Sequence, residues 1–300
     1  MPVVVVRRRP VVRRPVVRRP SSVRRLATVP RKPLPPINPC TVFKWAPYGT
    51  RGVNHDNCYD YAFDYYNPRS TGKTQMGNLN KYNSQHPKLT GYTTCNGIAK
   101  RVLDDYKGLA YKLPSGSAPV KPGYYKVMNF IAPGYGDFHW YKQISWVVYK
   151  TRAPGNKPII GVRRHGDTVQ GLAAFFQVPQ AVIRAAYARA RRPANANDGR
   201  VSMNGTDLRR LNNLNDKPDR DGMLRPGRVM TIPVKLWAHK QGFGGGPVLV
   251  DASGRTIRDP RRADRNYGGL NYTRFCGAYA VKYGAGRLAL ARARRAGLEP

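Results

Sequence analysis

The segment from residue 165 to residue 233 decides how this chain is divided. It reads HGDTV at 165–169, GLAAFFQVP at 171–179, LRRLNNL at 208–214 and LRPGRVMTIP at 224–233. These runs predict a turn, a short helix, a Leu-rich helix ending in Asn, and a Pro-Gly turn into a last strand. The order predicts a small unit set inside a larger domain.

Local chemistry supports this order. Asp167 or Thr168 can cap the first helix by accepting an orphan backbone N–H, and the apolar residues of 172–178 give that helix a buried side. Two leucines of 208–214 lie three residues apart, so they share one face of a second helix. A Pro-Gly turn then leads into the β-prone end of 226–232.

This arrangement of motifs resembles the LysM module, a βααβ fold, over residues 161–233. Residues 187–206 look inserted before the second helix. LysM modules bind N-acetylglucosamine polymers such as peptidoglycan or chitin, so the resemblance implies a glycan partner. It points to Gly166, Asp167, Thr168 and Asn212 as binding residues. A helical hairpin with a β-ribbon and no glycan site is the alternative.

Residues 1–43 form a basic tail of low complexity. They hold eleven Lys or Arg and no Asp or Glu, in a chain of net charge +37. The unit VVRRP repeats at 11–15 and 16–20, and its prolines forbid a helix and favour extended or polyproline II backbone. Such a tail binds polyanions by counterion release, here nucleic acid or an acidic or capsid protein surface, unless it is a solvated spacer. The predicted contacts are Arg7, Arg8, Arg9, Arg13, Arg14, Arg18, Arg19, Arg24 and Arg25.

The few cysteines and the short apolar runs exclude several classes of protein. No run is long enough for a signal peptide or a membrane span. Four cysteines in 300 residues are too few for a disulfide scaffold, so we expect reduced thiols at Cys40, Cys58, Cys95 and Cys276. The cysteines lack zinc spacing and the glycines of 242–246 lack the other residues of a phosphate loop, so we predict no metal and no cofactor.

The flanking segments, 44–160 and 234–283, read as one α+β domain interrupted by the LysM-like unit, and a basic C-terminal tail follows at 284–300. The expected elements are a helix at 98–106 capped by Asn96 or Thr94, strands at 124–131, 138–143, 144–149 and 248–251, and a basic helix at 287–295. FHWY at 138–141 and WAHK at 237–240 suit two strands that meet in space.

A second resemblance lies in the flanking domain. NCYDYA at 57–62 is similar to the nucleophile segment of CHAP-type amidases and NlpC/P60 thiol hydrolases, where Cys begins a helix, and DFHWY at 137–141 stands where those families present His on a strand. With the motifs at 237–240 and 251–255, the segment 54–280 also looks like an uncharacterised family of bacteria and large DNA viruses. The resemblance implies a papain-like or NlpC/P60-like fold.

The implied catalytic residues are Cys58, His139 and His239. A Cys at a helix N-terminus feels the positive end of the dipole, which favours the thiolate. His139 would take its proton, and His239 or Asp251 would orient that imidazole. Such a site suits hydrolysis of amide bonds, including peptide crosslinks in a cell wall. The alternative is a Cys that fills a core.

Three functions fit these observations. We favour a structural or assembly component of a large particle, such as the virion of a large DNA virus, with a basic tail and a LysM-like glycan-binding module. The second is a cell-wall-targeted thiol hydrolase, an amidase or peptidase that uses Cys58 and His139. The third is a DNA-binding or DNA-condensing protein. Loss of turnover on changing Cys58 separates the second from the first.

Overall fold

The computed structural model describes residues 42–43, 56–67, 74–80, 85, 94–151, 168–190, 224, 227–242 and 247–298. The chain divides into two compact units, residues 1–36 and 37–300, and every described residue belongs to the second. The nine arginines predicted to bind polyanions lie outside the described residues. So do three of the predicted glycan-binding residues, Gly166, Asp167 and Asn212.

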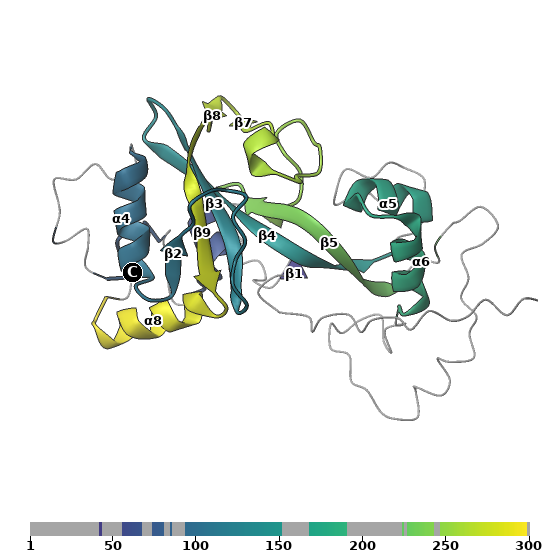
Figure 1. The fold of residues 1–300 in the computed structure, drawn as a ribbon, viewed down its shortest axis with the longest axis horizontal. Helices are drawn as coiled ribbons and strands as arrows, with labels where there is room; N and C mark the ends of the chain where they lie inside the picture. The colour runs from purple at the N-terminus through teal and green to yellow at the C-terminus, as the bar shows by residue number, and fades with distance from the viewer. Residues whose placement is uncertain are drawn as a thin grey trace, which may run out of the picture. The chain divides into compact units, whose positions relative to one another are not determined.

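Seven strands of the described residues form one sheet (Figure 1). Their bounds are β1 Val42–Phe43, β2 Ala110–Lys112, β3 Tyr124–Ala132, β4 Asp137–Lys150, β5 Val229–Lys240, β6 Pro247–Val248 and β9 Arg274–Lys282. The order is β2, β9, β3, β4, β5, β6, and β1 pairs with β4. Every pairing is antiparallel except that of β1 with β4. The fold is therefore mixed, with helices around a mostly antiparallel sheet, as expected for an α+β protein.

The remaining elements are α2 Cys58–Phe63, α4 Cys95–Asp105, α5 Val169–Phe176, α6 Gln180–Ala188, α8 Ala285–Arg295, the 3-10 helix η2 Pro260–Arg262, and the small hairpin of β7 Asn266–Tyr267 and β8 Leu270–Asn271. Threonines cap two helices, as predicted: Thr94 accepts from the Gly97 N–H at 3.1 Å and Thr168 from the Gly171 N–H at 2.9 Å. The basic helix predicted at 287–295 is α8. No helix in the described part of the chain is long and apolar enough to cross a membrane.

Two of the predicted strands, 138–143 and 144–149, are a single strand. β4 runs unbroken from Asp137 to Lys150, so the predicted division between them is wrong. A register shift against β5 between Ile144 and Trp146 absorbs the irregularity and lets the strand continue. β5 is also continuous across residue 233, where we placed the end of the LysM-like unit.

Side chains alternate along the strands and sort the core into two faces. Val127 and Trp140 belong to the core that packs against α2, α4 and α8. Met128 and Tyr141, their neighbours in sequence, belong to a separate core that is closed by residues of the loop 249–272. Successive side chains on β4 therefore point alternately toward the helices and toward this loop.

Helices α5 and α6 pack against the far parts of β4 and β5 (Figure 1). Leu172 and Phe176 of α5 and Ile183 of α6 are almost fully buried and form one core with Tyr149 and Met230. The first predicted LysM-like helix is thus present, and a second helix follows it directly after Pro179. The Leu-rich helix predicted at 208–214 lies outside the described residues, and the LysM assignment stays a prediction.

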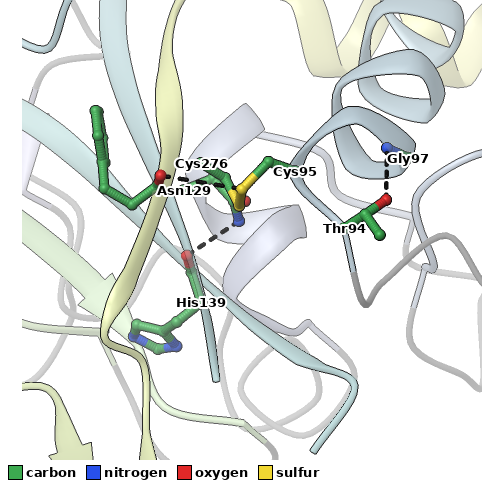
Figure 2. The surroundings of a disulfide bond; sticks show 7 residues. Thr94, Cys95, Gly97, Asn129, His139 and Cys276 are labelled. Carbon is green, nitrogen blue, oxygen red and sulfur yellow. Dashed lines mark hydrogen bonds between the residues drawn. A yellow bond between two sulfur atoms is a disulfide. The ribbon is translucent and has the colours of Figure 1, made fainter. Parts of the chain in front are cut away.

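A disulfide between Cys95 and Cys276 joins the start of α4 to β9 (Figure 2). Our prediction of reduced thiols is therefore wrong for this pair, which lies 181 residues apart in sequence. Beside Asn129, β9 slips by one residue against β3, and Cys276 is the extra residue. The bulge places the Cys276 side chain in the core shared with the helices, where Cys95 can reach it.

Candidate catalytic site

Cys58 is the first residue of α2, as the sequence predicts. Asn57 caps this helix by accepting from the backbone N–H groups of Tyr59 at 2.8 Å and Asp60 at 3.0 Å. The Asp60 carboxylate accepts in return from the Asn57 N–H at 3.1 Å, which completes a capping box. The local sequence thus fixes where the helix begins and, with it, the position of the thiol.

The chemical state of Cys58 differs from our prediction. Its side chain is buried among the aromatic residues between the helices and the sheet. Burial raises the pKa of the thiol to about 12, and the nearby carboxylates of Asp137 and Asp60 act in the same direction. The predicted lowering of the thiol pKa is therefore wrong, because the loss of hydration on burial has the largest effect on it.

His139 and His239 form a hydrogen-bonded pair across β4 and β5. The distance from His139 Nε2 to His239 Nδ1 is 2.8 Å. His239 Nε2 lies 2.9 Å from the Val250 carbonyl oxygen, which can only accept, so that nitrogen carries the proton. His239 Nδ1 is then an acceptor, and His139 Nε2 must donate to it. This chain of hydrogen bonds leaves His139 Nδ1 as the unprotonated nitrogen of a neutral ring.

Both imidazoles stay neutral near pH 7. Burial lowers the pKa of His239 to about 4, and it lowers the pKa of His139 well below its ordinary value, with the charge of His239 acting the same way. Among the described residues, Nδ1 of His139 has no hydrogen-bond partner. Asn129 on β3 holds the backbone of His139, because its Nδ2 donates to the His139 carbonyl oxygen at 3.2 Å (Figure 2).

The thiol lies beside the backbone of β4 next to His139, and no hydrogen bond joins it to the His139 imidazole. Cys58 Sγ is 3.8 Å from the Phe138 carbonyl oxygen and also interacts with the backbone of Trp140. These two groups flank His139 on β4, at a part of the strand that β5 leaves unpaired because it ends at residue 240. The sulfur therefore occupies the position beside β4 that a neighbouring strand would otherwise fill.

A cavity of about 640 Å³ opens beside His139 on the face of the sheet that the loop 249–272 covers. Its lining includes the carboxylates of Asp137 and Asp251 and the rings of Tyr267 and Tyr272, but not Cys58. Tyr272 and Tyr267 stand 5.0 and 5.4 Å from the His139 ring, centre to centre. The imidazole is thus the floor of an aromatic and acidic cavity.

Asp137 and Tyr272 are bonded to each other in the lining, and Asp137 precedes Phe138, whose carbonyl the thiol contacts. The Tyr272 hydroxyl donates to Asp137 Oδ2 at 2.8 Å, and Asp137 Oδ1 accepts from the Phe138 N–H at 2.7 Å. Burial and this bond to Asp137 raise the pKa of Tyr272, and the charge of Cys58 raises it further. The phenol therefore remains a hydrogen-bond donor to Asp137.

Asp251, our alternative partner for the imidazole, instead organises the loop that follows it. Its Oδ1 accepts from the Ser253 hydroxyl at 2.7 Å and from the Arg255 N–H at 2.9 Å, and its Oδ2 accepts from the Asp264 N–H at 3.1 Å. Burial raises its pKa, but these hydrogen bonds outweigh that effect and hold it below the ordinary value. Of the two candidates, His239 is the one that is hydrogen-bonded to His139.

The other predicted sites are less complete. Thr168 is described, and its hydroxyl caps α5, so that oxygen is already engaged within the protein. No group of three or more His, Cys, Asp or Glu suited to a metal ion occurs in the described part of the chain. Sequence reasoning missed Tyr267 and Tyr272 as lining residues, because they stand in a polar loop with no pattern that predicts which way a side chain points.

Comparisons with known proteins add no assignment. A scan against protein-family models, a search of curated proteins and a search of solved structures found no match to this chain.

Proposed function

We propose that the protein is a thiol hydrolase that cleaves amide bonds with Cys58, His139 and His239. One observation carries the proposal: the thiol of α2 lies at the Phe138 carbonyl of β4, and the next residue, His139, is bound through its imidazole to His239 on β5. A nucleophile, a base and a residue that orients the base are the parts this chemistry needs.

In the proposed mechanism, both groups start neutral. Cys58 Sγ attacks the carbonyl carbon of the amide as its proton passes to His139 Nδ1, the nitrogen left unprotonated by the bond to His239. His139 then gives this proton to the leaving amine as the C–N bond breaks. Water, deprotonated by the same nitrogen, hydrolyses the thioester and restores the thiol. A raised thiol pKa and a lowered imidazole pKa are consistent with this neutral starting pair.

In this proposal, the substrate reaches the buried sulfur only after a side chain moves. Cys58 is 6% exposed and lines no part of the cavity, whereas Tyr272 lines it and donates to Asp137, the residue before Phe138, whose carbonyl the thiol contacts. In this proposal the substrate displaces the Tyr272 ring when it binds. Tyr272→Ala should therefore speed the labelling of Cys58 by iodoacetamide, while Tyr267→Ala should change it less.

The decisive test is release of amine from purified peptidoglycan. Cys58→Ala and His139→Ala should abolish turnover while the far-ultraviolet circular dichroism is retained, and Cys40→Ala should leave turnover unchanged. Because the starting pair is neutral, kcat/KM should fall only at acid pH, below 6.5, with no second fall between pH 8 and 10. Turnover that survives in Cys58→Ala, or an inactive native protein, contradicts the proposal.

A second proposal, assembly through a basic surface, rests on α8. Its last turn presents Arg292, Arg294 and Arg295 as exposed side chains, and the helix contains no acidic residue. Arg292 also donates to the Lys107 carbonyl at 2.8 Å, which brings a further exposed lysine next to it. With the predicted basic tail, this face suits nucleic acid or an acidic protein surface within a large particle such as a virion.

Salt-dependent binding of duplex DNA tests this assembly role. Replacing Arg292, Arg294 and Arg295 together by Ala should reduce the slope of log K against log salt by about 3, since each phosphate contact contributes about 0.9. The matched control replaces the exposed arginines Arg255, Arg258 and Arg274, with the same change in charge. Equal losses in both variants would show that α8 is not a specific contact.

A further inference from the structure

The cavity beside His139 is acidic within a strongly basic protein. The chain has 53 Lys or Arg against 16 Asp or Glu. Even so, the described residues that line the cavity include Asp137 and Asp251 and no lysine or arginine. The charge of the lining is therefore opposite in sign to that of the whole chain.

The basic side chains close to the lining are engaged within the protein, and one of them, Arg255, lies 3.9 Å from Asp251 Oδ2. Lys240 is fully buried, and its ammonium donates to the Gly242 carbonyl. The Arg265 guanidinium lies over the Phe130 ring, 4.5 Å from its centre, and donates to three backbone carbonyls. None of these side chains belongs to the lining, and Asp137, unlike Asp251, has no ion-pair partner among the described residues.

Two further features point to a ligand rather than to a solvated hollow. His139 is 3% exposed and lines the cavity, and its Nδ1 lacks a partner among the described residues, so it is free to accept a hydrogen bond from an occupant. The rings of Tyr267 and Tyr272 flank it, and aromatic faces attract ammonium groups through their quadrupole.

We propose that the cavity selects substrates that carry a primary ammonium group beside the amide to be cleaved, and that Asp137 receives this ammonium. Each Asp137 oxygen accepts one hydrogen bond within the protein and keeps a further lone pair. A substrate with a carboxylate at the same position is repelled by Asp137 and Asp251. The inference rests on the proposed function and adds its substrate class.

Binding to the Cys58→Ala protein tests this inference without turnover. Isothermal titration calorimetry compares alanyl-alanine amide, which has a free amine, with its N-acetyl analogue, which does not. We expect the free amine to bind at least tenfold more tightly. Asp137→Asn removes the carboxylate charge and should abolish the difference. Tyr272→Phe removes the hydrogen bond from the Tyr272 hydroxyl to Asp137 but keeps the carboxylate, so it should retain the difference.

The outcomes separate this inference from the proposed function. Equal or tighter binding of the acetylated peptide overturns the inference, and so does binding of neither peptide. If the free amine binds selectively but the native protein releases no amine from any substrate, the hydrolase proposal fails and the cation-selective cavity stands. If the native protein cleaves both peptides equally well, only the ammonium selection fails.

Discussion

Asp56 and Cys58 lie two residues apart at the start of α2, and burial raises the pKa of both. The thiol reaches about 12 and the carboxyl about 7, the latter moderated by the charge of Lys240. Asp56 is 4% exposed, and its Oδ2 has no hydrogen-bond partner among the described groups. Ionising this carboxyl inside the folded protein therefore costs free energy that the unfolded chain does not pay.

Replacing Asp56 by Asn tests this cost. A folded pKa of about 7, raised from 3.8, means that the stability linked to Asp56 is present below pH 4 and is lost as pH rises through 7. The Asn side chain does not ionise, so the variant avoids this loss. Its free energy of unfolding relative to that of the native protein should therefore rise by about 2–3 kcal/mol from pH 5 to pH 8. Urea unfolding at both pH values measures the difference. An equal effect of the substitution at both would show that Asp56 does not titrate in this range.

At the scale of elements, the contact of α8 with the end of α2 leaves no space for a side chain. Asp64, the left-handed residue that ends α2, has its carbonyl oxygen 2.1 Å from the position that a Cβ on Gly286 would occupy. Gly286 is the second residue of α8, so the close approach sets how the basic helix lies against the core. The obstacle is backbone and cannot rotate away.

Gly286→Ala should therefore destabilise the protein, although alanine favours helices. We expect a loss of roughly 3 kcal/mol in the free energy of unfolding, at the upper end for overpacking. Leu288→Ala serves as the control in the same helix, since Leu288 is 46% exposed and should change stability by less than about 0.5 kcal/mol. Chemical unfolding compares the two, and a neutral Gly286→Ala would mean that α8 docks more loosely.

At the scale of the whole molecule, one covalent link spans much of the chain. The disulfide of Cys95 and Cys276 closes a loop of 181 residues and ties α4 to the sheet on the face that holds Cys58. In the chain-entropy account, such a loop restricts the unfolded ensemble and stabilises the folded state by roughly 5 kcal/mol. The link thus connects stability to the redox state of the surroundings.

The prediction is a loss of about 2–5 kcal/mol when both cysteines are replaced by Ala. The native protein should lose a similar amount in dithiothreitol, and the double variant should not respond to the reductant. Urea unfolding with and without dithiothreitol makes the comparison. Alkylation of Cys95 and Cys276 in the unfolded, unreduced protein would contradict the disulfide.

Local signals in the sequence predicted local structure well. The cap at Thr94 and the cap at Thr168 were recognisable because each is a side chain that meets its own helix within three residues. The start of α2 at Cys58 and the meeting of the two strands that carry 138–141 and 237–240 were also predictable from motifs. The division of β4 failed because strand continuity depends on its partner, which the sequence alone does not show.

The candidate site was predictable in identity but not in state. The sequence by itself identified Cys58, His139 and His239 as the candidate residues and determined that the chain is strongly basic. Tertiary structure alone decided that the thiol is buried and protonated, that the two histidines are neutral partners, and that Tyr272 lines the cavity next to His139. The reason is physical: residue types and caps are local properties, whereas desolvation and hydrogen-bond partners come from segments brought together only by folding.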